Sequence, residues 1–199
     1  MIARSTRRVA AVCMALALLA ACGKPATETF RATDVTGAPF GRTLALTDHT
    51  GKPGTLDDWK GKIVAVFFGY AQCPDVCPTT MSMLREVKEQ LGPDGAKLQV
   101  VFVTVDPERD TQQVLSAYVP GFDPTFIGLR GDVDQTAAAA KEFKIFFAKS
   151  AGPTPTSYTV DHTSAVFVFD TQGRLRLFAG PALKAADYVH DIKLLLAGR

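Results

Sequence analysis

The sequence predicts an α/β fold in which helices flank a mixed central sheet. Two continuous runs of β-branched and aromatic residues, at 62–69 and 98–106, are typical of strands that are buried on both faces. The segments that follow these runs repeat apolar residues every three or four positions, as amphipathic helices do. Because the two kinds of segment alternate, we expect β-α units that pack helices against the sheet.

Other elements are expected on either side of the first buried strand. Short alternating apolar pieces surround a turn at 48–51, which predicts an added N-terminal β-hairpin. The strand at 62–69 leads through two cysteines into a helix that Gly92 and Pro93 should stop.

The second half of the chain completes the predicted sheet. Asp110 is expected to cap a helix at 111–119, and another helix is expected at 132–143. The run 164–170 turns into a further strand, and a last helix covers about 183–196. Strands that alternate with helices and finish in a hairpin and a helix form the thioredoxin-like arrangement. This fold alone fixes no function.

The first residues predict a signal peptide. Arg4, Arg7 and Arg8 precede an apolar run, 9–21, that is too short to span a bilayer. The run ends in Leu19-Ala20-Ala21-Cys22, which is similar to the bacterial lipobox, where the cysteine is lipidated and tethers the mature protein to a membrane.

We therefore expect a leader at 1–21, a flexible tether at 22–38 and one folded domain at 39–199, anchored through Cys22 on the periplasmic side of a bacterial membrane. The chain has 22 basic and 20 acidic residues, and the leader removes three arginines and no acid. The mature chain is therefore close to neutral, and its charge does not indicate a nucleic-acid partner.

Only two cysteines keep free sulfur chemistry after this processing. Cys13 is lost with the leader and Cys22 carries lipid, which leaves Cys73 and Cys77 at the end of the first buried strand, where α/β sheets place ligands. They could form a structural disulfide, a redox couple or half of a metal site. A disulfide across so short a loop restrains the unfolded chain little. The three intervening residues, one more than in thioredoxin-type pairs, modestly favour a metal.

Pro78 predicts the geometry around the two sulfurs. A helix that included Cys73 would drive the proline ring into the carbonyl of Pro74, so the helix is expected to begin near Cys77, with Cys77 as its N-cap. At that position the helix dipole should lower the pKa of the thiol below its ordinary value.

A third metal ligand would have to come from the three histidines. His49 lies in a hairpin turn and His190 on the last helix, and both are expected to be structural. His162 differs, because it directly precedes a central strand and follows a Gly/Pro-rich segment, 150–156, that is predicted to be a flexible loop. Two thiolates and an imidazole suit copper, with zinc as the chemical competitor.

Three blocks of the sequence carry a resemblance to a known family. "FFGYAQCPDVCPTTM", "VTVDPERDT" and "VDHTSAVFVFD" resemble, in order and spacing, the signature blocks of the Sco (SenC) family of copper-delivery proteins. The resemblance implies that Cys73, Cys77 and His162 bind Cu(I) or Cu(II) in a thioredoxin fold. It also implies a role in assembling the dinuclear CuA centre of cytochrome c oxidase, with subunit II of the oxidase or another copper-accepting protein as the partner.

The same family contains members proposed to act as thiol-disulfide reductases. Cys73 and Cys77 would then be a redox-active pair that reduces the cysteines of an apo copper protein, and this enzyme activity is the alternative to copper delivery. A peroxide-reducing relative of the peroxiredoxins is less favoured, because their lone cysteine with a nearby Thr or Ser and Arg has no counterpart in the sequence.

Overall fold

The structure, a computed structural model, describes residues 28–199 except 153, 155 and 156. The expected leader at 1–21 and the expected lipidation site, Cys22, lie outside the described residues. Within the described part, no helix combines the length and the apolar character needed to cross a bilayer.

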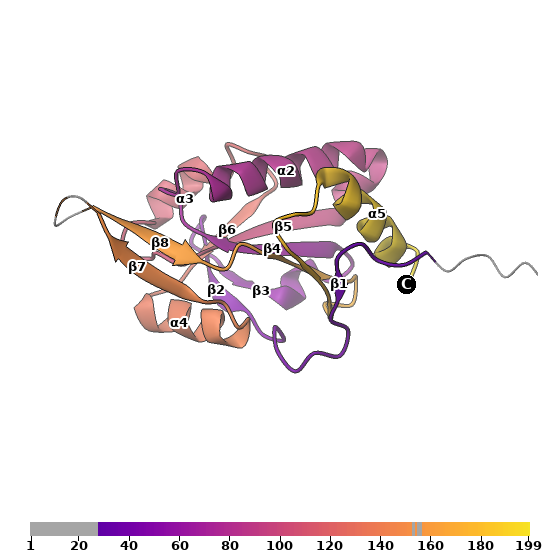
Figure 1. The fold of residues 1–199 in the computed structure, drawn as a ribbon, viewed down its shortest axis with the longest axis horizontal. Helices are drawn as coiled ribbons and strands as arrows, with labels where there is room; N and C mark the ends of the chain where they lie inside the picture. Colours follow the sequence, from indigo (N-terminus) through magenta and orange to yellow (C-terminus); the bar gives the residue numbers. More distant parts are fainter. Residues whose placement is uncertain (1–27, 153, 155–156) are drawn as a thin grey trace, which may run out of the picture.

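An eight-stranded mixed sheet forms the centre of the domain (Figure 1). Its strand order is β1-β10-β9-β4-β5-β6-β2-β3. Parallel pairs join β4 to β5 and β5 to β6, whereas β9 runs antiparallel to β4. The strands are β1 (Thr33–Asp34), β2 (Ala45–Asp48), β3 (Pro53–Thr55), β4 (Ile63–Gly69), β5 (Leu98–Thr104), β6 (Ile127–Arg130), β9 (Val166–Phe169) and β10 (Leu175–Ala179).

Helices cover both faces of this sheet, as the sequence predicts. Figure 1 shows α2 (Val76–Gln90) and α5 (Ala185–Leu196) above the sheet and α4 (Val133–Glu142) below it. Another helix, α3 (Gln112–Tyr118), joins the parallel strands β5 and β6 by a crossover. Two short 3-10 helices complete the set, η1 (Leu56–Trp59) and η2 (Gly92–Lys97).

Aromatic side chains from β4, β5 and β9 fill the core between the layers. Phe67, Phe68, Phe102 and Phe167 are fully buried, and the rings of Phe68 and Phe167 both contact Phe143 after α4. Every residue of β4 and β5 is buried, which explains why both strands read as continuous apolar runs. The mixed α/β fold with its thioredoxin-like arrangement is confirmed.

Two predictions at the N-terminal side had different outcomes. The expected hairpin is present, with β2 antiparallel to β3 around the turn. The flexible tether, expected to reach residue 38, does not extend so far, because β1 pairs with β10 and the amides of Arg31 and Ala32 donate to the Asp191 carboxylate. The folded unit therefore begins before residue 39. A buried carboxylate on α5, about 160 residues away, was not a partner that local composition could reveal.

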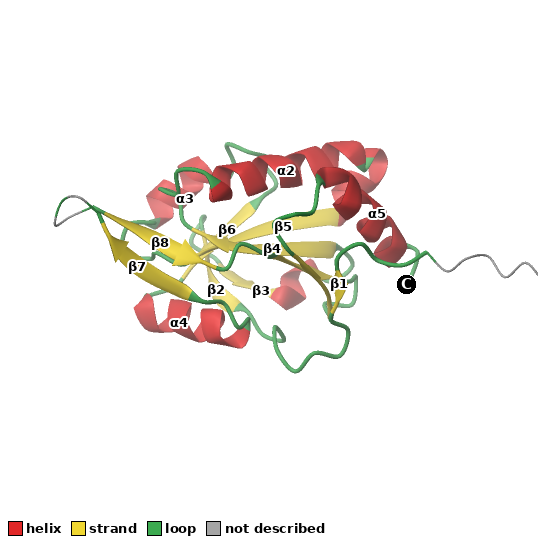
Figure 2. Ribbon diagram, in the orientation of Figure 1, coloured by secondary structure: helices red, strands yellow, loops and turns green. Residues whose placement is uncertain are grey.

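Two strands lie on either side of the loop predicted before His162. β7 (Phe147–Ala151) and β8 (Tyr158–His162) form an antiparallel two-stranded ribbon that projects beyond the main sheet (Figure 2). The first strand includes Ser150 and Ala151 of the predicted loop, and positions 153, 155 and 156 lie outside the described residues. In β8, Tyr158, Val160 and His162 alternate with polar residues, a pattern too short to predict a strand by itself.

The helix cap predicted at Asp110 is wrong by one residue. Thr111 is the N-cap of α3, and its hydroxyl accepts from the amide of Val114. The Asp110 side chain points inward instead and accepts from the Thr104 hydroxyl at 2.6 Å and from the Ala71 amide at 2.9 Å. Asp110 thus joins the strand ends to each other and does not serve its own helix.

Candidate metal centre

The cysteine half of the centre lies where β4 passes into α2. The helix begins at Val76 with Asp75 as its N-cap, so Cys77 is the second helical residue and not the cap that the sequence predicts. The first helical hydrogen bond runs from the Thr79 amide to the Asp75 carbonyl at 3.2 Å. Pro78 stays within the first turn, where no amide donor is needed and no helical carbonyl lies four residues back. The helix can therefore start one residue before Cys77.

Burial changes the expected chemistry of Cys77. Its side chain is fully buried, and this desolvation raises the pKa of the thiol far above the ordinary value. The predicted lowering by the helix dipole is therefore wrong for Cys77, because burial outweighs the dipole. In the metal-free protein Cys77 is a neutral thiol at neutral pH.

Gly69, the last residue of β4, makes room for this sulfur. A Cβ at this position would lie 2.8 Å from Cys77 Sγ and 3.0 Å from the Phe102 ring. Only glycine therefore fits beside the thiol without displacing it. Sequence reasoning did not single out Gly69, although a glycine at the end of a buried strand beside a reactive loop is a usable signal of close approach.

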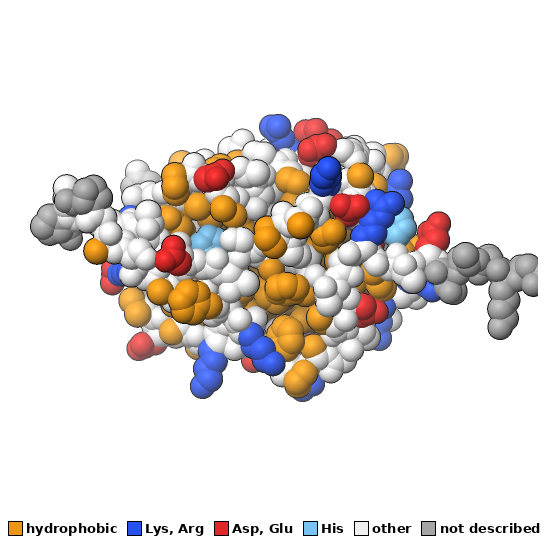
Figure 3. Space-filling model, in the orientation of Figure 1, with side chains coloured by type: hydrophobic (Ala, Val, Ile, Leu, Met, Phe, Trp, Pro, Cys, Tyr) orange, Lys and Arg blue, Asp and Glu red, His pale blue; other side chains and the backbone are white. Residues whose placement is uncertain are grey.

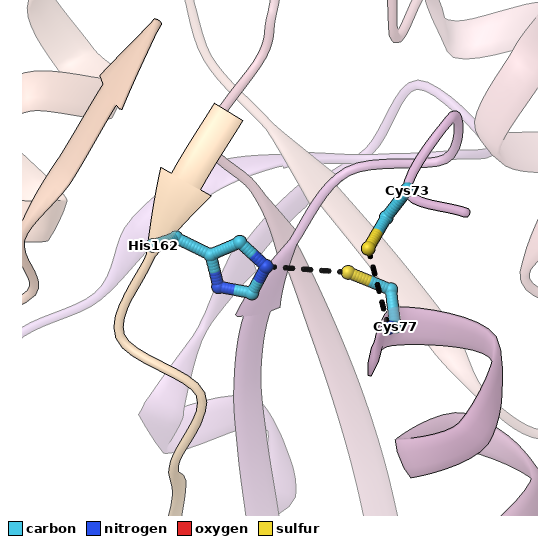
Figure 4. A group of neighbouring side chains, drawn as sticks. All are labelled: Cys73, Cys77 and His162. Atoms are coloured by element: carbon cyan, nitrogen blue, oxygen red, sulfur yellow. Dashed lines mark hydrogen bonds between the residues drawn. The ribbon is translucent and has the colours of Figure 1, made fainter. Parts of the chain in front are cut away.

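Cys73 lies on the loop above the start of α2 and is only partly buried. The amide of Cys77 donates to Cys73 Sγ at 3.4 Å (Figure 4). Cys73 is thus the less buried of the two cysteines, and Cys77 holds the deeper position. Both cysteines are free thiols.

His162 ends β8 and closes the third side of the centre. Its Nε2 lies 3.4 Å from Cys77 Sγ, and its Nδ1 lies 3.2 Å from the Thr163 carbonyl (Figure 4). Because a carbonyl only accepts, Nδ1 is the protonated nitrogen and Nε2 carries the free lone pair in the neutral ring. The lone pair that a metal ion needs therefore points at the thiol.

The surroundings of His162 keep the imidazole neutral. Burial lowers its pKa, against weaker opposing effects of the Thr163 carbonyl and the Asp161 carboxylate. The rings of Phe67 and Tyr70 each lie edge-on to the imidazole with centroids 6.0 Å away. Apolar side chains also gather on the surface around the end of β8 (Figure 3).

The three predicted ligands thus come together from three segments of the chain. The sulfur atoms of Cys73 and Cys77 and a ring nitrogen of His162 all lie within 4.8 Å of one another. Two sulfurs and one imidazole form a soft donor set of the kind that copper prefers, and zinc is its chemical competitor. The donor chemistry and the spacing both fit a single three-coordinate ion.

The other two histidines are structural, as expected. Nδ1 of His49 accepts from the Gly128 amide at 3.0 Å and so ties the N-terminal hairpin to β6. His190 lies beside Asp191 on α5, with 2.8 Å between Nδ1 and the carboxylate. Neither belongs to the Cys-Cys-His group.

The chain is similar to known proteins along almost the whole described part. A family model described as SCO1/SenC matches residues 32–197. The mitochondrial protein SCO2 homolog of Mus musculus is 33% identical over 156 residues, which cover 77% of this chain and 61% of that protein. The chain thus spans about three fifths of this relative's length.

Solved structures show the same fold. ScoI of Bradyrhizobium japonicum with copper bound is 35% identical with a TM-score of 0.71, and the match covers 78% of this chain and 99% of that one. Apo Sco1 of Thermus thermophilus is 40% identical with a TM-score of 0.74, over 85% and 99% of the two chains. Yeast Sco1 with copper bound is 29% identical with a TM-score of 0.73, over 80% and 90%.

Proposed function

Because this chain belongs to the SCO1/SenC family, we propose that it is a copper metallochaperone that binds Cu(I) or Cu(II) through Cys73, Cys77 and His162. The observation that carries the proposal is the convergence of two sulfurs and one imidazole nitrogen within 4.8 Å. Relatives of similar fold hold copper in their solved structures, including ScoI of Bradyrhizobium japonicum and yeast Sco1.

The arrangement suits a site that both holds and releases its ion. Nε2 of His162 is ready to donate its lone pair, whereas the buried Cys77 thiol must lose a proton when the ion binds. Cys73 and His162 are both only partly buried, whereas Cys77 is buried, so a thiol of a recipient protein can approach the ion from the side of these two ligands. Three-coordinate binding leaves a coordination position for this incoming thiol. The ion can then pass to the recipient as its ligands are exchanged one at a time.

Competition for Cu(I) between the protein and a chromogenic chelator tests this function. We expect the wild-type protein to bind one Cu(I), and Cys73→Ser, Cys77→Ser and His162→Ala each to bind more weakly. His49→Ala is the matched control, since the His49 side chain accepts from the Gly128 amide of β6 and does not belong to the Cys-Cys-His group. Equal and weak binding by the wild type and His162→Ala would show the proposal to be wrong.

The same two cysteines support a second candidate function, thiol-disulfide reduction. Cys73 is partly exposed and Cys77 is buried beside it, as an attacking and a resolving thiol would be. Cys73 would attack the disulfide of an apo copper protein, forming a mixed disulfide and releasing one substrate thiol. Cys77 would then attack Cys73 Sγ, which releases the second substrate thiol and leaves a Cys73–Cys77 disulfide. The two thiols would thus supply two electrons and two protons. Failure of Cys77→Ser to trap a mixed disulfide with such a substrate would exclude this function.

We further propose that the recipient of the copper ion is subunit II of cytochrome c oxidase, at its CuA site, or another copper-accepting protein. We also propose that a lipid on Cys22 holds the chain at the periplasmic side of a bacterial membrane. The lipobox-like ending at 19–22 supports the anchor, and the family resemblance supports the recipient. Cys22→Ser should move the protein from the membrane fraction to the soluble fraction, and mass spectrometry of the wild type should find a diacylglyceryl group on Cys22.

A further inference from the structure

We propose that Arg109 is a positioning residue that sets the distance between His162 and the two cysteines. This inference rests on the proposed copper-binding function. Arg109 belongs to the loop 105–111 that follows β5, and neither it nor any other residue of that loop is one of the three ligands. The loop contacts both halves of the centre, and we call it the bracket.

The ribbon that carries His162 needs such support. In the described part of the chain, β7 and β8 form a separate sheet that shares no ladder with the eight-stranded sheet. An isolated two-stranded ribbon is marginally stable at best. Its position over the cysteines must therefore be fixed by side-chain contacts, and the bracket supplies several of them.

The bracket holds the ribbon through Tyr158, four residues before His162 on β8. The Tyr158 hydroxyl donates to the Asp106 carboxylate at 2.8 Å, and Arg109 donates to the Tyr158 carbonyl at 2.9 Å. The Arg109 guanidinium also stacks over the Tyr158 ring at 3.6 Å. Because side chains alternate along a strand, Tyr158 and His162 point to the same face of the ribbon, with buried Val160 between them.

The bracket also holds the cysteine loop. Asp110 accepts from the Ala71 amide at 2.9 Å, and Arg109 donates to the Gln72 side chain at 3.3 Å. The guanidinium lies 5.5 Å from the ring of Tyr70, which in turn flanks the His162 imidazole. One arginine thus contacts the residues next to Cys73 and the strand that ends in His162.

Arg109 is itself fixed by a buried ion pair. Its Nε pairs with the Asp106 carboxylate, whose side chain is fully buried, while the arginine side chain is 18% exposed. A buried pair holds its members in place, and its loss leaves an uncompensated charge. The planar guanidinium contacts the Asp106 carboxylate, the Tyr158 carbonyl and the Tyr158 ring at the same time, which a lysine ammonium cannot do.

Arg109→Lys tests the proposal because it keeps the positive charge beside Asp106 and removes the planar fork. We expect the Cu(I) affinity to fall about tenfold, as is usual when a residue that orients a metal ligand is changed. Arg176→Lys is the matched control. Arg176 is similarly buried, 12% exposed, and pairs with buried Asp170 at the other end of the sheet. We expect this control to leave the copper affinity unchanged.

A double-mutant cycle separates positioning from a general loss of stability. If Arg109 acts through His162, adding Arg109→Lys to His162→Ala should weaken Cu(I) binding no further. The Cu(II) form of Arg109→Lys should lose the nitrogen hyperfine coupling in its electron paramagnetic resonance spectrum. A tenfold effect that persists without His162 would overturn the proposal.

Hydrogen exchange on the metal-free protein tests the bracket independently of copper. We expect Arg109→Lys to speed amide exchange at 158–162 at least tenfold and to leave β4 unchanged, and Arg176→Lys to change neither. If the wild type failed to bind copper, the proposed function would be wrong, yet this measurement would still decide the role of Arg109. Unchanged exchange at 158–162 would refute it.

Discussion

The two halves of the metal centre are attached to the fold in different ways. The sulfur of Cys77 lies at the junction of β4 and α2, packed against Gly69 in the fully buried core. The imidazole of His162 lies at the end of a ribbon that belongs to a separate two-stranded sheet. Cys77 is therefore anchored in the core, whereas His162 depends on a few side-chain contacts. Under the proposed function, this arrangement gives the site one ligand that can move without unfolding.

The largest expected effect comes from removing a core ring under the centre. Phe67→Ala in β4 should lower the free energy of unfolding by about 3–5 kcal/mol, because Phe67 is fully buried against Phe102 and faces His162. Phe146→Ala at the base of the ribbon should change it by no more than about 0.5 kcal/mol, since that ring is 65% exposed. Urea denaturation measures both. Equal losses of unfolding free energy in the two variants would contradict a difference in stability between the cysteine half and the histidine half.

A smaller effect is expected from crowding the buried sulfur. Gly69→Ala places a methyl group 2.8 Å from Cys77 Sγ, so we expect a loss of about 1–3 kcal/mol in unfolding free energy and weaker Cu(I) binding. Gly180→Ala is the matched control, because a Cβ there meets nothing within 4 Å. Denaturation and the chelator competition measure the two outcomes. If Gly69→Ala bound Cu(I) with wild-type affinity, the Cys77 sulfur could shift away from the added methyl group without loss of binding, which would contradict the prediction.

The histidine half should respond locally rather than globally. Tyr158→Phe removes the hydrogen bond to Asp106 and keeps the ring, so the ribbon should open more easily by about 1 kcal/mol. Faster amide exchange at 158–162 with an unchanged urea midpoint is the expected result. In Tyr118→Phe the lost hydroxyl has no hydrogen-bond partner within the described residues, and ribbon exchange should stay as in the wild type. A large shift of the midpoint in Tyr158→Phe would mean that the ribbon is part of the core.

The last prediction concerns acid and the far end of the sheet. Burial by itself raises the pKa of Asp170, but hydrogen bonds from Arg174 and from the Gln172 amide outweigh it and hold the pKa below its ordinary value. Stability from this group is therefore present above the unfolded pKa near 4 and is lost as the pH falls through the folded pKa. Asp170→Asn should be less stable than the wild type at pH 7, and the difference should shrink toward pH 3. Urea denaturation across this range measures it, and a difference independent of pH would contradict the assignment.

The buried strands and the ligands could be predicted from sequence because their signals are local or chemical. The runs at 62–69 and 98–106 are mostly apolar, and they form β4 and β5 within a few residues of the predicted ends. Cys73, Cys77 and His162 were identified as candidates from residue type and position, and the structure brings them together. Two cysteine sulfurs next to a strand end are soft donors, and they leave few chemical roles other than metal binding or redox chemistry.

Two of the errors share a physical cause, since each depended on partners far away in the chain. The pKa of Cys77 follows burial under the core, which the helix position alone does not reveal. Asp110 bonds to Ala71 across 39 residues and so does not cap its own helix. The loop predicted at 150–156 begins too early, because Ser150 and Ala151 pair with β8 in the ribbon. The bracket lies within the block "VTVDPERDT", but its contacts to Tyr158 depend on the fold.

The separate sheet formed by β7 and β8 has a consequence for how this protein can diversify. Substitutions along the outer positions of the ribbon alter the surface beside the metal without entering the ladder of the main sheet. Under the proposed function, the surface that meets a recipient can therefore change with little effect on the main sheet. Changes in one hairpin would then be enough to give the scaffold a new recipient, while the sulfur ligands and the core beneath them stay the same.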